Sequence, residues 1–132
     1  MDRLDYVIRS SPVVLHPDRY AYLAVDELPV GGEHLMVYAN GVDRTVVTRE
    51  ALVPDVPHLA SESWFRLLEC ETSTPFETPG LLARITGAVA SAGLNVLILS
   101  TFSRDCALVR DHDLDAALDA LRAAGFEIRT PG

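Results

Sequence analysis

The sequence contains no lysine, so all 11 of its basic residues are arginine. Acidic residues outnumber them at 19, which leaves a formal net charge of −8 at neutral pH. The arginines are scattered along the chain, whereas binding to nucleic acid or to an anionic membrane surface requires a clustered cationic field. We therefore expect neither nucleic acid nor a membrane as a partner.

Cysteine and long apolar runs are also scarce. Cys70 and Cys106 fit no metal-ligand spacing and make a weak disulfide framework, so we expect two buried thiols in a reducing compartment. No apolar run approaches the roughly 20 residues of a membrane span. The acidic start at residues 1–5 does not resemble a signal peptide. These features predict a cytoplasmic protein.

No catalytic or metal-binding motif stands out. There is no Gly-x-Ser-x-Gly string, and neither cysteine has a histidine close in sequence. The four histidines lie far apart, without His-x-His or His-Glu-x-x-His spacing. Residues 111–115 begin like a calcium loop, but Ala116 and Arg122 stand where that loop needs glycine and glutamate. We expect no enzymatic activity, no metal and no cofactor.

The most regular stretch of the chain is residues 77–102. Thr78 is placed to be a helix N-cap, and Pro79 suits the first helical position. Apolar residues then recur at spacings of three and four until Gly93, which is expected to end the helix. Residues 94–100 are nearly all apolar, which predicts a buried strand directly after the helix.

The second half of the chain, residues 61–132, alternates in a recognisable order. Strands are predicted at 64–70, 94–100, 106–110 and 126–129, with the helix above and a second one opening at residue 111. This β-α-β-β-α-β order predicts an α+β, ferredoxin-like fold, with a four-stranded antiparallel sheet and two helices on one face.

The first half, residues 1–60, has the features of short strands with little helix. Apolar runs at 4–8, 12–15 and 20–25 are separated by turn residues. Asn40-Gly41 between two further apolar runs predicts a hairpin. Residues 51–60 contain two prolines and are predicted to be a connector. We expect residues 1–60 to be a mostly β, reduced copy of the unit at 61–132.

Two polar features of the second half suggest a ligand. A helix N-terminus at 78–82 presents free backbone N–H groups that can hold an anionic group. Residues 100–105, Ser-Thr-Phe-Ser-Arg-Asp, cluster hydroxyls, a cation and a carboxylate at the end of the predicted strand. Together they could bracket a small zwitterion, its carboxylate on the N–H groups and its amine or side chain near Asp105. Taken singly, the helix start is better explained as an ordinary capped helix, and an ordinary turn explains residues 100–105 as well as a ligand site does.

Several strings in the second half resemble the ACT domain, the ligand-binding regulatory module first recognised in aspartate kinase. The resemblance covers about residues 62–129, and its strongest part is Ser-Thr-Phe-x-x-Asp at 100–105 after Ala-Gly-Leu at 92–94. The other matching strings are Trp64, Phe-Glu-Thr-Pro-Gly-Leu-Leu at 76–82 and Ala-Gly-Phe at 124–126. The pattern is especially similar to small bacterial tandem ACT-like proteins and to the CASTOR-type amino-acid sensors.

The resemblance also implies a binding site, because members of that family hold a free amino acid between ACT units. The implied contacts at the helix start are Thr78, Gly80, Leu81 and Leu82. The implied contacts elsewhere are Thr101, Phe102 and Asp105 at the turn, and Val46 and Val47, which would offer mainly backbone.

Three residues at the implied site depart from the family pattern. Arg104 replaces a threonine or aromatic residue, Val46 a serine and Arg44 a glutamate. An added cation at 104 would repel a guanidinium group. This favours a ligand with an acidic or apolar side chain, or no ligand at all, over arginine.

The resemblance thus implies a non-enzymatic, cytoplasmic regulatory protein that binds a small molecule, an amino acid first of all, at an interface between ACT units. Because such modules bury open sheet edges against one another, a homodimer is expected. Two alternatives stay open. One is a degenerate ACT module that serves as an interaction or dimerisation unit without a ligand. The other is a small enzyme on a ferredoxin-like scaffold.

Overall fold

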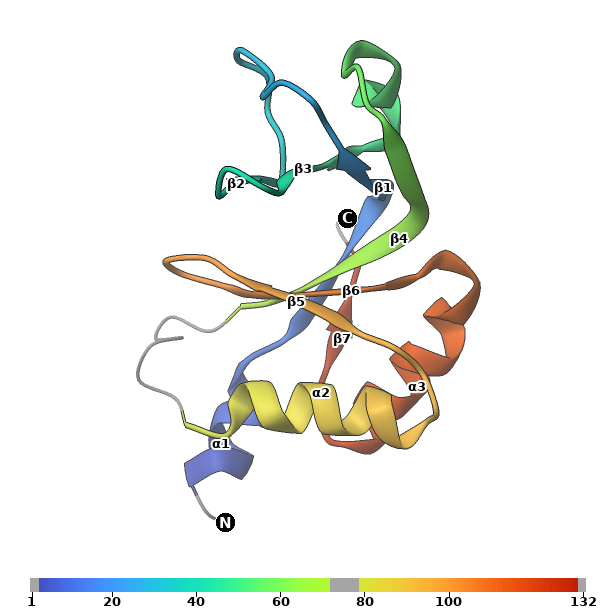
Figure 1. Ribbon diagram of the computed structural model, residues 1–132. Helices are drawn as coiled ribbons and strands as arrows, with labels where there is room; N and C mark the ends of the chain where they lie inside the picture. The colour runs from blue at the N-terminus through green and yellow to red at the C-terminus, as the bar shows by residue number, and fades with distance from the viewer. Residues whose placement is uncertain (1–2, 72–78, 131–132) are drawn as a thin grey trace. The chain divides into compact units, whose positions relative to one another are not determined.

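The computed structural model describes residues 3–71 and 79–130 (Figure 1). The chain divides into a larger unit, residues 1–17 with 66–132, and a smaller unit, residues 18–65. Both boundaries fall inside long strands, β1 (Val13–Ala24) and β4 (Ala60–Cys70), so each of these strands contributes to both units. None of the helices in the described residues is long and apolar enough to cross a membrane.

The larger unit has the predicted order of elements after β4. Its remaining elements are α1 (Arg3–Ser10), α2 (Leu81–Ser91), β5 (Leu97–Ser100), β6 (Asp105–Arg110), the 3₁₀ helix η3 (Asp111–Asp113), α3 (Leu114–Ala123) and β7 (Ile128–Arg129). Its strands lie in the order β7-β1-β4-β6-β5, and α2 and α3 cover one face of the sheet (Figure 1). The α+β, ferredoxin-like prediction is confirmed.

One strand position differs from a four-stranded ferredoxin-like sheet. The first part of β1 lies between β4 and β7, and it pairs with β7 in parallel, Val13 opposite Ile128. The Val13 N–H donates to the Glu127 carbonyl at 2.8 Å, and the Glu71 N–H donates to the Pro12 carbonyl at 2.9 Å. The beginning of the chain therefore supplies a strand to the larger unit.

The core of the larger unit lies between this sheet and the helices α1, α2 and α3. The buried residues that it draws from the helices are Ile8, Leu81, Ile85, Val89, Ala117, Leu118 and Leu121. The strands contribute Val13, Leu68, Cys70, Ala107 and Val109. Burying each of these aliphatic side chains completely stabilises the folded state by about 1.5–3 kcal/mol.

The strand predicted at residues 4–8 is wrong, because these residues lie in helix α1. Leu4, Val7 and Ile8 are spaced at three and four, so a helix turns all three toward the core, where Ile8 is 2% exposed. A five-residue apolar run is too short for periodicity to separate the two structures.

The predicted start of α2 is also wrong, because the helix begins at Leu81 and not at Pro79. Gly80 is the N-cap and has a φ of +87°, in the left-handed region that other residues avoid. Thr78 lies outside the described residues. At the far end the prediction is confirmed: α2 ends at Ser91, and Gly93 follows with a φ of +79°.

The smaller unit, residues 18–65, is mostly β. It contains β2 (Met36–Ala39), β3 (Arg44–Arg49), the 3₁₀ helix η1 (Glu50–Asp55) and parts of β1 and β4. β3 pairs antiparallel with β2 and with β1, where Leu23 lies opposite Val46. The Asn40 side chain accepts the N–H groups of Val42 and Asp43 and so closes the predicted hairpin turn. Most of η1 lies in the predicted connector, residues 51–60.

Candidate functional site

Asp105 is a buried carboxylate at the first position of β6. It is 7% exposed and lies opposite Ser100 of β5, whose hydroxyl donates to Asp105 Oδ1 at 2.7 Å. Among the described residues this hydroxyl is its hydrogen-bond partner, and no ion pair to Asp105 is formed there. One neutral donor therefore supports this carboxylate among the described residues.

Asp105 and Leu82, two of the predicted site residues, line the same small cavity. Its walls also include Ile85 of α2, Cys70 of β4 and Cys106 of β6. The cavity measures about 10 Å³, which is room for about one water molecule. A free amino acid can enter only if side chains such as Leu82 move aside.

The two cysteines beside Asp105 are free and buried, as predicted. Burial raises the pKa of the Cys70 thiol to about 12, and the Asp105 carboxylate raises it further while Arg104 lowers it. Burial and the Glu69 carboxylate raise the pKa of the Cys106 thiol to about 11. Both thiols are therefore protonated at neutral pH and are poor nucleophiles.

The start of α2 supplies the second half of the predicted site. The Arg84 N–H donates to the Gly80 carbonyl at 3.0 Å, and this is the first hydrogen bond of the helix. The N–H groups of Leu81 and Leu82 precede it and make no hydrogen bond within the helix. The Leu81 side chain is fully buried in the core, whereas Leu82 is half-buried and faces the cavity. At Leu81 it is thus the backbone N–H group that is suited to contact a ligand, and at Leu82 the backbone N–H group is available as well.

The hairpin loop at residues 101–104 connects β5 to β6. The Thr101 N–H donates to the Arg104 carbonyl at 2.8 Å, and the Thr101 hydroxyl oxygen accepts the Arg104 N–H at 3.0 Å. Phe102, at the tip, is 86% exposed. The loop is therefore closed by its own hydrogen bonds and presents an aromatic side chain to solvent.

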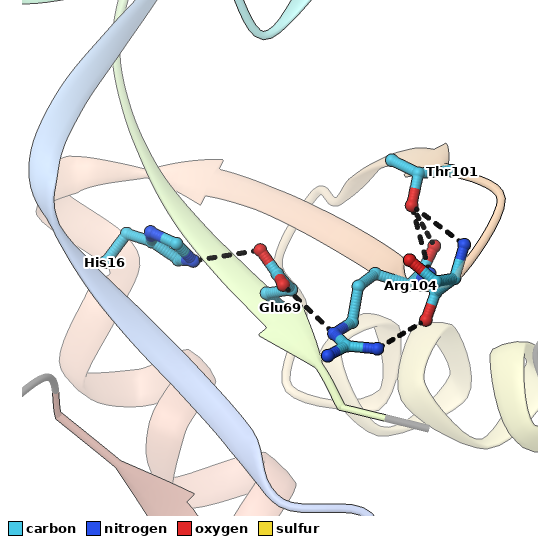
Figure 2. Close-up of polar contacts among 5 residues, drawn as sticks. His16, Glu69, Thr101 and Arg104 are labelled. Carbon is cyan, nitrogen blue, oxygen red and sulfur yellow. Dashed lines mark hydrogen bonds and ion pairs between the residues drawn. The ribbon is translucent and has the colours of Figure 1, made fainter. Parts of the chain in front are cut away.

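Arg104 forms an ion pair that sequence reasoning missed (Figure 2). Its Nε lies 3.3 Å from Glu69 Oε1 of β4, and its Nη1 donates to the Ser103 carbonyl at 2.8 Å. The other oxygen of Glu69 lies 3.0 Å from His16 Nε2 of β1. The sequence held a weak indication, since Glu69 is an acid between the apolar residues of a predicted strand. Because Glu69 offsets the charge of Arg104, that arginine repels a basic ligand less than the sequence alone suggests.

The predicted contacts Val46 and Val47 lie in β3 of the smaller unit. Both are fully buried, and both pair with β1 on one side and with β2 on the other. Their backbone groups thus take part in the sheet. Their role in ligand binding stays a prediction.

Residues 61–123 match the family model described as the ACT domain. No curated protein sequence matches the chain. Solved structures with the same fold include a protein from Agobacterium tumefaciens, with a TM-score of 0.78 and 18% identity over 92% of this chain and 94% of that one. A protein of unknown function from Vibrio cholerae has a TM-score of 0.72 and 19% identity, over 92% and 94%.

The ligand-free regulatory subunit of aspartate kinase from Thermus thermophilus also shares the fold. It has a TM-score of 0.64 and 15% identity, over 89% of this chain and 99% of that one. At these identities the likeness establishes the fold and leaves the activity open. The chain therefore has the fold of the aspartate kinase regulatory subunits, and the match to the ACT domain spans residues 61–123.

Proposed function

We propose that this chain is a regulatory ACT-domain protein that binds a free amino acid beside Asp105. The observation that carries the proposal is the buried carboxylate of Asp105, whose hydrogen-bond partner among the described residues is one hydroxyl. Asp105 lines the same cavity as Leu82, at the start of α2. A buried charge without a counter-charge is costly, and a ligand ammonium group would offset that cost. Binding at this position is thus favoured for ligands that carry an amine.

The two ends of a zwitterion suit the two halves of the site. The N–H groups of Leu81 and Leu82, together with the positive end of the α2 dipole, suit a carboxylate. The ammonium or a basic side chain suits Asp105, and the Arg104–Glu69 pair keeps the nearest arginine from opposing it. The cavity has to enlarge on binding, so ligand binding would select a more open packing of α2 on the sheet.

The finer points of the proposal follow from the same features. We propose that the protein is not an enzyme, since both thiols keep high pKa values and the described residues hold no cluster suited to a metal ion. We also propose that Val46 and Val47 contact the ligand. The protein is further proposed to form a homodimer and to be cytoplasmic.

A second candidate is an ACT module that has lost its ligand and acts as an interaction unit. The observation that favours it is the size of the cavity, about 10 Å³. In that case the cost of burying Asp105 is offset by Ser100 alone.

A thermal-shift screen of the purified protein against the twenty amino acids tests the first candidate. A ligand at 100 times its Kd adds about 2.7 kcal/mol of stability, which raises Tm visibly. The rise is expected to be lost in Asp105→Asn, which keeps the shape of the side chain and removes its charge. Asp119→Asn is the matched control, because Asp119 is 81% exposed on α3 and should respond like the parent.

The outcome distinguishes the two candidates. A response to one amino acid that needs Asp105 supports the sensor. If no amino acid raises Tm, and Asp105→Asn makes the protein more stable by removing an uncompensated charge, the ligand-free module is supported.

A further inference from the structure

The smaller unit carries a hollow between two loops, residues 25–35 and 56–59. Three large apolar side chains surround it although they are exposed: Leu28 at 40%, Val30 at 104% and Leu59 at 75%. The hollow has a volume of about 420 Å³. Apolar side chains gathered in this way beside polar ones mark interaction sites, whereas single exposed ones do not.

The loops that form the hollow are anchored at their ends. The Val25 N–H donates to the Arg44 carbonyl at 3.0 Å, and the Leu35 N–H donates to the Val47 carbonyl at 2.8 Å. The second loop is anchored by the Leu59 N–H, which donates to the Ala24 carbonyl at 2.7 Å. The hollow is therefore built into the smaller unit before any partner arrives.

The charged residues that line the hollow are both acidic. Asp26 and Glu27 supply two exposed carboxylates at its edge. His58 Nδ1 lies 2.8 Å from the Val56 carbonyl and donates to it, so this nitrogen is already engaged within the chain. None of the lining residues is an arginine. The hollow thus combines an apolar wall with negative charge, and its complement is an apolar group next to a cation.

We propose that this hollow docks a peptide segment of a protein partner in which basic side chains alternate with aliphatic ones. The aliphatic side chains would pack on Leu28, Pro29 and Pro57, while the basic ones would face Asp26 and Glu27. A segment of another protein fits better than a small molecule, because nearly all lining residues are exposed, whereas small-molecule pockets enclose most of their ligand. This surface is separate from the residues proposed to bind an amino acid.

The test is a titration of the ¹⁵N-labelled full chain with the peptide acetyl-Leu-Arg-Leu-Arg-Leu-amide, followed by amide chemical shifts. Shift changes are expected in residues 25–32 and 56–59, and the affinity should fall as salt screens the charges. The double variant Asp26→Asn/Glu27→Gln and the single variant Leu59→Ser should each weaken binding about threefold or more. Val42→Ser is the control, since Val42 is 93% exposed outside the hollow and its loss should leave the affinity unchanged.

Several results would overturn the proposal. One is the absence of shift changes at millimolar peptide. Another is equal binding of the peptide with glutamate in place of arginine, which would remove the charge argument. A third is a set of shift changes spread over acidic surfaces elsewhere, such as Asp119 and Glu127, which would indicate non-specific attraction to a chain of net charge −8.

Discussion

Asp105 and Glu69 are carboxylates on the adjacent strands β6 and β4, and they differ in whether basic side chains contact them. Glu69 contacts His16 and Arg104, one with each oxygen (Figure 2). Asp105 is more deeply buried, yet Ser100 is its hydrogen-bond partner among the described residues. A carboxylate that contacts basic side chains links those parts of the fold. A buried carboxylate that lacks such a contact favours the binding of a cation. Glu69 therefore suits a stabilising role, and Asp105 is the carboxylate that we propose to bind the ligand.

Glu69→Gln tests the stabilising role of the compensated carboxylate. The Glu69 side chain is 25% exposed, so its contacts are only partly screened, and we expect a loss of about 1 kcal/mol in the free energy of unfolding. Urea denaturation measures it. Glu127→Gln is the control, because Glu127 and its partner Arg129 are both 55% exposed and their pair should contribute less than about 0.5 kcal/mol. Equal losses in the two variants would refute the assignment.

Helix α2 is the element that forms one wall of the proposed amino-acid site. Its buried face, Leu81, Ile85 and Val89, follows from the spacing of apolar residues in the sequence. Its first residue depends on Gly80, whose left-handed conformation precedes the helix and exposes the N–H groups of the first turn. A sequence pattern locates the face of a helix more reliably than its end, because several residues near an end suit the cap.

Two glycines of this region are expected to respond in opposite ways to alanine. At Gly80 the φ of +87° strains any side chain, and a Cβ would lie 3.2 Å from Leu4 Cδ2, so Gly80→Ala should cost about 1–2 kcal/mol. Gly87 lies inside α2, and a Cβ there would meet nothing within 4 Å, so Gly87→Ala should stabilise by about 0.5–1 kcal/mol. Thermal unfolding measures both. A Gly80→Ala variant as stable as the parent would contradict the left-handed N-cap at residue 80.

At the scale of the whole molecule, the two ends of the chain build one unit. Residues 1–17 belong with residues 66–132, and β1 pairs with β7 near the end of the chain. The division expected from the sequence, 1–60 and 61–132, instead separates α1 from the helices whose core it shares. Whether the first half is a reduced ACT-like unit stays a prediction.

Ile8→Ala tests the place of α1. Ile8 is 2% exposed in the core with α2 and α3, so its truncation should cost about 2–4 kcal/mol. Hydrogen exchange of peptides from α2 and α3 should rise with it, because these helices share the core. Tyr6→Ala is the control, since Tyr6 is 67% exposed on the same helix, and its effect should stay near 0.5 kcal/mol or less. Unchanged exchange in α2 and α3 would support the division at residue 60.

The sequence by itself determined the fold class and which polar side chains can contact a ligand. The periodicities of the second half specify its helices and strands, because a repeat of 3.6 or 2 puts apolar residues on one face. Asn40-Gly41 specifies a turn for the same local reason, since few residues adopt its backbone conformation. For the same reason, the sequence places a candidate site at Asp105, Leu82 and the start of the helix at 78–82.

Only the tertiary structure decided which of these residues meet. The insertion of β1 between β4 and β7 depends on hydrogen bonds between backbone groups, which carry no sequence pattern. The pairing of Arg104 with Glu69, and of Glu69 with His16, joins residues 35 and 53 positions apart that no local rule connects. Side chains from β1, β4, α2, β5, β6 and α3 meet around the cavity beside Asp105 and close it to the size of one water molecule. Packing between distant segments, which depends on shape and burial, determines these features.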